Sequence, residues 1–444
     1  MPFRAWRYSS QAGALTRLVA PPYDVIGPDQ QSRLYALDQH NIVRVDLGLT
    51  TPSDSDCDNQ YTRAAAQLAK WKHAGILVRD SEPSVTFVEE NFTGPDGRDL
   101  VRHGFLAAIR LFEFDEGVVF PHEQTLSGPK EDRYRLMTAT GMNLSPIFLL
   151  YDLPSDTITA AWQASLRTSE PQAIVTGDDG TITKLWPTSQ PGLPEVVRHN
   201  LADSRFLIAD GHHRYETALR YRREHRNPAS EYAIGYFSNM SDPGLAIYGT
   251  HRLVAGLDAG RVADLPRSLA SAFAVEKLTV DTKPQGGAAP GGSRDAGAAA
   301  QHAIAEYLAA HPRRAFGLWG PAFDTPYGFS LLDPAAAHAA APGHSAAYQE
   351  LDVTILQTLV LEKGLGISPA DMAAERYLTF FKDSNEAFSR LEAGEFQAGF
   401  FMNPTGLDQV REVAFGGERM PQKATFFYPK LPTGLVFLDL NGRL

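Results

Sequence analysis

The chain has 444 residues, of which 43% are hydrophobic, and its formal net charge is −11. This length and apolar content predict about two to three domains with at least one large core. The acidic balance argues against a nucleic-acid partner, because such binding needs a basic surface that releases counterions from phosphates. The single cysteine, Cys57, excludes an internal disulfide and a metal cage built from cysteines.

The sequence shows no signal for export or for membrane insertion. Residues 1–6 lack an apolar core followed by a small-residue cleavage site. Apolar residues elsewhere occur in short runs, well below the roughly 20 that a membrane-spanning helix needs. We therefore expect a cytoplasmic protein with no membrane partner; the sequence does not indicate its oligomeric state.

Residues 1–115 are expected to form an amino-terminal α/β region. A helix is predicted from Asn59 to His73, because Ala64, Leu68 and Trp71 recur at helical spacing and Gly75 follows as a stop. Short β-rich runs predict strands at 42–47, 84–89 and 104–112.

Two further regions complete the expected organisation. Residues 116–255 contain two dense polar motifs separated by a less patterned insertion near 153–200. Residues 256–444 are expected to form a carboxyl-terminal α/β domain. Its Gly- and Pro-rich stretch near 282–298 is too poor in apolar residues to order itself and predicts a flexible loop. Alternation of strands (315–318, 328–332, 397–402) with helices (353–362, 384–391) gives an α/β (α+β) fold class for the whole chain.

The most informative motif is Asp-Gly-His-His-Arg at 210–214. It follows the apolar strand 206–209 and precedes a helix. The first amides of a helix have no partner within the helix and suit phosphate oxygens. Gly211 permits a close backbone approach, His212 and His213 supply donors, and Arg214 can grip phosphate with a bidentate fork. Asp210 can cap the helix or face a phosphate-bound Mg²⁺ ion.

The second motif, Pro-His-Glu-Gln-Thr at 121–125, follows another short apolar run. A carboxylate beside a phosphate site can accept the proton of an attacking hydroxyl, so Glu123 is the candidate base, with His122 beside it. Lys130 and Arg133 can neutralise charge on the transferred group. A helix cap followed by solvent-exposed charge explains the same string equally well.

Weaker signals concern the substrate. Asn143 and Ser145 lie in a polar loop where they can contact a ligand, although capping accounts for them as well. Lys423 and Thr425 are separated by one residue and would point the same way on an extended chain, where they could hold an anionic group together. An ordinary edge strand would have the same pattern.

The three strings, in this order, resemble the ParB/sulfiredoxin-like superfamily, and more closely its kinases that phosphorylate free L-serine. The shared features are Pro-His-Glu-Gln, a later Asp-Gly-His-His-Arg that opens a helix, and a terminal Pro-Lys-X-Thr, which reads Pro-Gln-Lys-Ala-Thr (421–425) in this chain. The whole chain also looks like a widespread bacterial and archaeal ParB-like family of unknown function, which shares Ala-Pro-Pro-Tyr-Asp (20–24) and Met-Pro-Gln-Lys (420–423). The resemblance implies a ParB/sulfiredoxin-like nucleotide-binding core at 116–255.

The resemblance also implies roles for the residues. Glu123 would act as base on the serine hydroxyl, residues 211–214 would bind the nucleotide phosphates, and Asp210 would help to hold Mg²⁺. Lys423 and Thr425 would contact the substrate or the product phosphate. We therefore expect an ATP- or ADP-dependent kinase of a small hydroxylated metabolite, with free L-serine as the best candidate. A ParB-like nucleotide-binding regulator or DNA-associated protein and a nucleotide hydrolase remain the alternatives.

Overall fold

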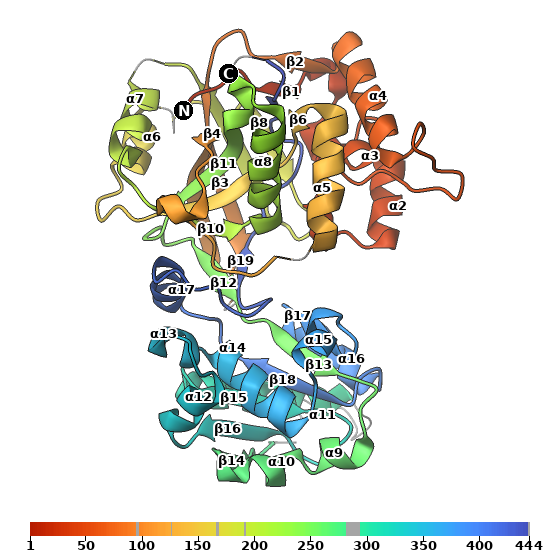
Figure 1. Ribbon diagram of the computed structural model, residues 1–444, viewed down its shortest axis with the longest axis vertical. Coiled ribbons are helices and arrows are strands. Elements are labelled where there is room, and N and C mark those ends of the chain that lie inside the picture. Colours follow the sequence, from red (N-terminus) through yellow and green to blue (C-terminus); the bar gives the residue numbers. More distant parts are fainter. Residues whose placement is uncertain (95–96, 126, 166–167, 191, 281–293, 443–444) are drawn as a thin grey trace, which may run out of the picture. The chain divides into compact units, whose positions relative to one another are not determined.

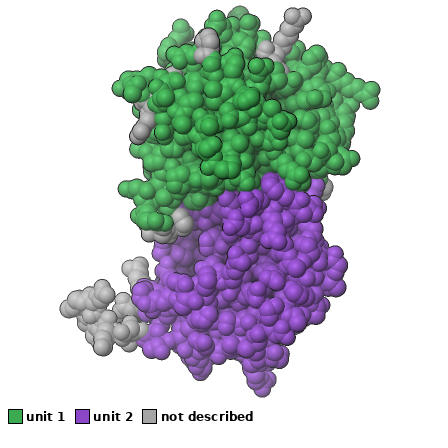
Figure 2. Space-filling model, turned by 90° about the vertical axis from the view of Figure 1, so that its left-hand side faces the viewer, with its two compact units in different colours: residues 1–121, 125–246, 427–444 green, residues 122–124, 247–426 purple. Residues whose placement is uncertain are grey.

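The structure is a computed structural model that describes residues 1–94, 97–125, 127–165, 168–190, 192–280 and 294–442. Its contacts divide the chain into two compact units, which are coloured separately in Figure 2. Unit 1 consists of residues 1–121, 125–246 and 427–444, and unit 2 of residues 122–124 and 247–426. Both units combine helices with sheets, so the predicted α/β (α+β) class is confirmed.

These boundaries differ from the three consecutive regions expected from the sequence. Strands of the expected region 1–115 pair with strands of the expected region 116–255 in one sheet. Shared hydrogen bonding therefore joins the two regions into a single unit. Residues 427–444 belong to that unit as well, although they follow the chain of unit 2.

Unit 1 is built on a mixed sheet that has eight strands within the described residues, in the order β5-β10-β7-β11-β4-β3-β9-β8. The pairs β5–β10 and β7–β11 are parallel, and the other neighbours are antiparallel. The predicted strands at 84–89 and 104–112 fall largely within β3 and β4. The strands are β3 (Val85–Thr93), β4 (Asp99–Arg110), β5 (Val119–Phe120), β7 (Ile147–Tyr151), β8 (Ala173–Thr176), β9 (Ile182–Thr188), β10 (Phe206–Asp210) and β11 (Tyr232–Asn239).

The helices α8 (His212–His225) and α5 (Ser127–Thr140) lie side by side, and α4 (Gln60–His73) packs next to α5 (Figure 1). The side chain of Asn59 caps α4 by accepting the N–H groups of Tyr61 and Thr62. Gly75 follows the helix with φ +70°, as predicted for its stop. Further elements of unit 1 are β1 (Trp6–Tyr8), α1 (Leu15–Leu18), α2 (Pro28–Leu37), β2 (Leu77–Arg79), β6 (Met142–Asn143), α6 (Thr157–Ser165), α7 (Leu193–Leu201) and β20 (Leu438–Asp439).

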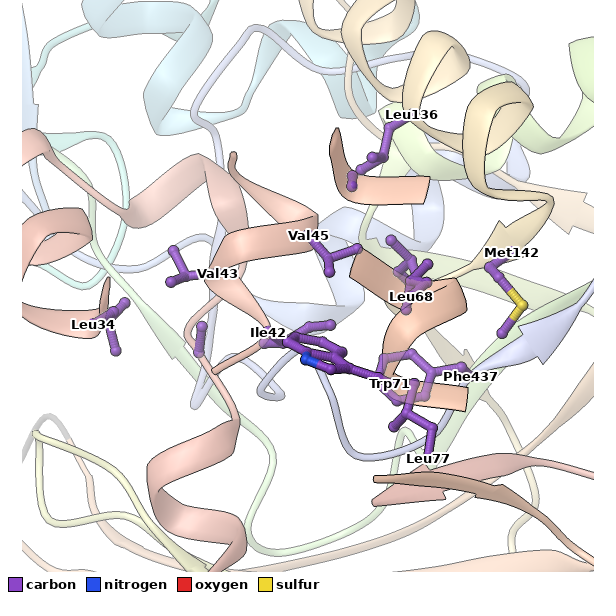
Figure 3. Close-up of a cluster of buried hydrophobic side chains, with 13 residues drawn as sticks. Leu34, Ile42, Val43, Val45, Leu68, Trp71, Leu77, Leu136, Met142 and Phe437 are labelled. Carbon is purple, nitrogen blue, oxygen red and sulfur yellow. The ribbon is translucent and has the colours of Figure 1, made fainter. Parts of the chain in front are cut away.

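A core of unit 1 centres on Trp71, which lies beside Ile42 and Phe437 in Figure 3. Segment 42–47, expected as a strand, instead contains the short helix α3 (Val43–Asp46). The side chain of Asn41 explains the difference, because its oxygen accepts the N–H of Val43 while its amide donates to the carbonyls of Arg17 and Val19. The β-branched residues of this turn are buried in the core, so the apolar pattern predicted their burial but not their conformation.

Unit 2 contains an antiparallel sheet that has six strands in the described part of the chain, in the order β14-β16-β15-β18-β13-β17. Helices α11 (Arg294–Ala310) and α16 (Ser384–Glu392) share a buried apolar cluster with this sheet. The predicted strands at 315–318, 328–332 and 397–402 match β15, β16 and β18. The strands are β13 (His251–Val254), β14 (Phe273–Lys277), β15 (Ala315–Trp319), β16 (Tyr327–Leu331), β17 (Leu378–Phe381) and β18 (Ala398–Met402).

A layer of shorter helices completes unit 2. The predicted helix at 353–362 is a short α-helix, α14, that continues as a π-helix over Leu356–Gly364. The other elements are α9 (Ala259–Ala263), α10 (Leu265–Ser268), α12 (Pro334–Ala340), α13 (Ala346–Gln349), α14 (Asp352–Ile355), α15 (Pro369–Ala373) and α17 (Leu407–Phe415). Besides the short passage at residues 122–124, the chain passes from one unit to the other within β12 (Ala246–Tyr248) and β19 (Phe426–Tyr428).

Three expectations about less regular parts of the chain have different outcomes. The flexible loop expected near 282–298 lies outside the described residues as far as 293, and residues 294–298 begin α11. The insertion expected near 153–200 supplies β8 and β9 at one end of the unit 1 sheet. Within the described residues, no helix is both long enough and apolar enough to span a bilayer.

Candidate functional site

The junction of β10 and α8 in unit 1 has the predicted strand–turn–helix form. Asp210 ends the strand, and Gly211 precedes the helix in the left-handed conformation, with φ +91°. A Cβ atom at Gly211 would lie 3.0 Å from the guanidinium of Arg214, so glycine meets both a backbone and a space requirement. His212 is buried and His213 is half-buried at the start of a helix of 14 residues. The amides of the first turn can hold an anion there.

The side chain of Asp210 is held by two cations. Its Oδ1 atom lies 2.9 Å from Nζ of Lys430, and its Oδ2 atom accepts a hydrogen bond from the Arg214 guanidinium. Nζ of Lys430 also lies 2.6 Å from a carboxylate oxygen of Asp24. Arg214 donates in addition to the carbonyl of Pro146. Arg214, proposed as a phosphate fork, is therefore already engaged by protein groups.

The pKa values of Asp210 and Lys430 keep both of these groups charged. Burial alone would raise the pKa of Asp210, but the charges of Lys430 and Arg214 outweigh it and hold that pKa well below its usual range. Burial would lower the pKa of Lys430, but Asp210 and Asp24 outweigh it and raise that pKa. The ion pairs of Asp24, Lys430 and Asp210, together with Arg214, therefore hold the end of β10 in place.

These contacts bear on Mg²⁺, which the sequence assigned to Asp210. Both carboxylate oxygens face cations, and a divalent ion would have to displace one of them. No group of three or more His, Cys, Asp or Glu side chains among the described residues is arranged to hold a metal ion. Asp210 in this arrangement therefore does not fit the role of a direct Mg²⁺ ligand.

Arg133 and Lys130 of α5 are also paired within unit 1. Arg133 is buried, its Nη1 atom lies 3.0 Å from Asp46, and its guanidinium sits 4.1 Å from the ring centre of Tyr23. It also donates to Asp132, which is its neighbour in the chain. Lys130 donates over 2.8 Å to Glu216 of α8. Both cations join α5 to other parts of unit 1.

Asn143 and Ser145, considered as ligand contacts, are buried with protein partners. The side-chain oxygen of Asn143 accepts the N–H of Ile234 over 2.7 Å. The hydroxyl of Ser145 lies 2.9 Å from that of Thr433. Asn143 thus satisfies a backbone group of β11, and Ser145 ties the segment before β7 to residues near the carboxyl end of unit 1.

In unit 2 the structure brings two of the predicted motifs together. Nε2 of His122 lies 2.7 Å from the hydroxyl of Thr425, and the carbonyl of His122 accepts the N–H of Met420 over 2.7 Å. The carboxylate of Glu123 accepts the N–H of Lys423 over 3.3 Å. Residues 122–123 thus run alongside residues 420–425, with Glu123 half-exposed and His122 buried.

Lys423 does not lie on an extended chain, contrary to the expectation from its spacing to Thr425. Its backbone is left-handed, with φ +55°, and residues 422–423 form a turn. Lys423 and Thr425 are therefore not successive same-side residues of a strand. The side chain of Lys423 is exposed, whereas the Thr425 hydroxyl contacts His122. Their role toward a substrate stays a prediction.

The candidate residues are divided between the units. Sequence reasoning gave no role to Asp24, Asp46 or Lys430. The signals available were the place of Asp24 at the end of the Ala-Pro-Pro-Tyr-Asp string and that of Lys430 shortly after Pro-Gln-Lys-Ala-Thr (421–425). Unit 1 contains Lys130, Arg133, Asn143, Ser145, Asp210, Gly211, His212, His213 and Arg214, and unit 2 contains His122, Glu123, Lys423 and Thr425.

The fold and the β10–α8 junction define a mixed α/β protein with a strand–turn–helix motif around Gly211. A sequence-family profile described as "Protein of unknown function (DUF1015)" matches residues 1–353, well over half of the chain. The protein therefore belongs to the DUF1015 family. No curated protein matches the chain.

The chain is similar to several solved structures. One is a conserved hypothetical protein from Pyrococcus furiosus, with 16% identity and a TM-score of 0.35 over 76% of this chain and 96% of that chain. Another is a free serine kinase variant in complex with AMP, with 14% identity and a TM-score of 0.37 over 76% and 92%. A third is SbnI from Staphylococcus aureus with a C-terminal truncation, with 11% identity and a TM-score of 0.34 over 76% and 88%.

Proposed function

We propose that this protein is a nucleotide-dependent phosphotransferase that acts on a small hydroxylated metabolite, with free L-serine as the leading candidate acceptor. The observation that carries the proposal is the start of α8. There a left-handed Gly211 is followed by His212 and His213, at the positive end of the helix dipole. ATP or ADP is the proposed phosphate donor, and Mg²⁺ would screen the negative charge of its phosphates.

The phosphate-binding groups in this proposal are backbone amides and imidazoles. Arg214 acts mainly by holding Asp210 and the Pro146 carbonyl, which fixes the turn that presents those groups. A fixed turn needs little reorganisation when charge develops on the transferred phosphoryl group. The conformational entropy of the turn is thus lost during folding, before nucleotide binds.

Glu123 is the proposed general base. Its carboxylate is half-exposed and accepts the N–H of Lys423, and a carboxylate is a group that can take the proton of an attacking hydroxyl. In the reaction, the hydroxyl oxygen of the acceptor forms a bond to the terminal phosphorus of the donor. The bond between that phosphorus and the leaving nucleotide oxygen breaks, and the hydroxyl proton passes to Glu123.

Full-length protein is incubated with Mg²⁺, ATP or ADP, and a panel of amino acids and hydroxy acids, and products are identified by mass spectrometry. We expect an acceptor that gains one phosphoryl group, with L-serine giving O-phospho-L-serine. Glu123→Gln should lower kcat by about 10²- to 10⁴-fold, because the variant keeps the shape of the side chain and loses the base. Glu306→Gln, an exposed change in α11, is the matched control and should leave kcat unchanged.

The alternatives give different results in the same assay. Release of phosphate without any phosphorylated acceptor would contradict the proposal and favour a nucleotide hydrolase. Absence of turnover together with salt-sensitive DNA binding would contradict it in favour of a nucleotide-binding regulator.

A further inference from the structure

Arg252 of unit 2 is a buried cation in the middle of a sheet. It belongs to β13, lies opposite Phe380 of β17 and Phe400 of β18, and is 3% exposed. Burial lowers the pKa of its guanidinium to about 10, so it remains protonated at neutral pH. A buried guanidinium normally has an anionic partner, because desolvating it without one is costly.

The contacts of Arg252 within unit 2 do not supply that anion. It donates to the carbonyl of Thr250, to Sδ of Met402 over 2.7 Å, and to the carbonyl of Lys423 over 3.1 Å. Among the described residues, no carboxylate forms an ion pair with it. Neutral acceptors thus hold the guanidinium in position, and no carboxylate among the described residues pairs with its positive charge.

Arg252 lines a cavity of about 160 Å³ inside unit 2. Three glutamines, Gln124, Gln357 and Gln422, line the same cavity, and its described lining contains no acidic residue. The amide of Gln357 donates to Glu362 over 3.1 Å. The apolar part of the lining includes Leu361 and Phe380. Gln357 and Leu361 come from the π-helical segment, a geometry that is rare in proteins and often occurs at binding sites.

The cavity adjoins both motif segments of unit 2. Gln124 follows Glu123 directly, and Gln422 precedes Lys423, whose carbonyl bonds to Arg252. The lining therefore includes the chain neighbours of both Glu123 and Lys423. About 160 Å³ has room for several heavy atoms, given that one water occupies about 30 Å³ of liquid.

We infer that this cavity binds the carboxylate of a small amino acid or hydroxy acid, with Arg252 as its ion-pair partner and the amides of Gln124 and Gln422 as further donors. This inference deepens the proposed function by naming the acceptor as a carboxylic acid. The statement that the bound acid is the acceptor rests on that proposed function. Arginine offers carboxylates a planar, two-donor fork, and neutral amides around it add hydrogen bonds without competing charge.

The affinity of the full chain for each probe is measured without nucleotide, by isothermal titration calorimetry and ligand-observed NMR. The probes are L-serine, D-glycerate, acetate and inorganic phosphate, together with L-serinamide, which lacks the carboxylate. We expect L-serine to bind at least about tenfold more tightly than L-serinamide, and Arg252→Met to remove this difference. Arg267→Met, which changes an exposed arginine of the same unit, should leave it intact.

Arg252→Met can also disturb folding, so a second variant keeps the arginine. Gln422→Glu places a competing carboxylate at the cavity and should weaken L-serine binding by about tenfold while L-serinamide binding stays the same. Equal affinity of wild-type protein for L-serine and L-serinamide would overturn the inference. So would tighter binding of phosphate than of every carboxylate probe, or absence of carboxylate binding at about 10 mM, where even a millimolar site is filled.

The two proposals fail in different ways. Carboxylate binding that depends on Arg252, without any phosphorylated product, would contradict the proposed kinase function and support the carboxylate site. Phosphorylation with the same KM and kcat in Arg252→Met as in wild type would support the kinase function and contradict the carboxylate site.

Discussion

Lys430 holds two carboxylates of unit 1 at once. Its ammonium contacts Asp24 and Asp210, and its side chain is 13% exposed. Replacement by methionine would remove the ammonium that both carboxylates share, while Arg214 would still donate to Asp210. We expect Lys430→Met to lower the free energy of unfolding of unit 1 by about 3 kcal/mol, measured by urea denaturation at pH 7. Lys70→Met, at an exposed position of α4, should change it by less than about 0.5 kcal/mol. A loss no larger than that of the control would contradict the bridging role.

Asp352 of unit 2 makes stability depend on pH in the opposite sense from a paired carboxylate. It is buried, accepts the N–H of Arg314 over 2.6 Å, and burial raises its pKa to about 6. A folded pKa above the unfolded value of about 4 means that its contribution is present at low pH and is lost as pH rises through 6. Asp352→Asn keeps the acceptor without the charge. At pH 8 we expect this variant to have a higher Tm than wild type, because its free energy of unfolding is greater by up to about 3 kcal/mol. At pH 4 the two proteins should have the same Tm.

Loss of one negative charge needs a control of its own. Asp408→Asn removes an exposed carboxylate of unit 2 and should give the same Tm difference from wild type at both pH values. A pH-independent effect of Asp352→Asn would show that the carboxyl group is ionised in the folded protein as readily as in the unfolded chain.

At the scale of elements, the β10–α8 turn depends on Gly211. Alanine there would strain a left-handed backbone and bring a Cβ within 3.0 Å of Arg214. Gly13 has φ +104°, and no atom lies within 4 Å of the place that a Cβ would take, so Gly13→Ala reports backbone strain alone. We expect Gly13→Ala to cost about 1 kcal/mol and Gly211→Ala to cost more and to weaken ATP binding, measured by thermal denaturation and titration calorimetry. Equal nucleotide affinity of Gly211→Ala and wild type would place the phosphates elsewhere.

Patterns of neighbouring residues predicted the elements best. The helix at 60–73 and the strands β10, β15 and β18 follow from periodicity and from Asn and Gly signals at their ends. The strand predicted at 42–47 was wrong because the hydrogen bonds of Asn41 outweigh the β preference of Val43 and Val45. At Lys423 the motif was visible, but its left-handed turn was not, since positive φ at a lysine has no sequence signal.

Partners that lie far apart in the chain were not predictable from local patterns. The charges of Asp24 and Lys430 make sense only once the fold brings them together over a separation of 406 positions. The same holds for the cavity around Arg252, whose lining comes from residues 124, 252, 348–380 and 421–422. Candidate residues with a motif were thus found, whereas those whose role depends on burial and pairing were missed.

For the molecule as a whole, unit 1 depends on the last part of the chain. Phe437 is buried in the cluster around Trp71 (Figure 3). We expect Phe437→Ala to cost about 3–5 kcal/mol and to reduce hydrogen-exchange protection most in residues of unit 1, including α4, although the substitution follows unit 2 in sequence. Phe401→Ala, in the apolar cluster of unit 2, is the matched variant and should reduce protection most in β15, β18 and α11. The same pattern of protection loss in both variants would contradict the division into units.

This arrangement has a consequence for biosynthesis. A ribosome makes residues 247–426 of unit 2 before residues 427–444, which belong to unit 1. Until the later segment emerges, Trp71 lacks Phe437, and Asp24 and Asp210 lack Lys430. Until then the nascent amino-terminal half has an exposed apolar surface and lacks the ammonium that Asp24 and Asp210 share, and exposed apolar surface is what chaperones recognise. Premature termination near residue 426 would leave unit 1 in that state permanently, even though every residue of unit 2 had already been made.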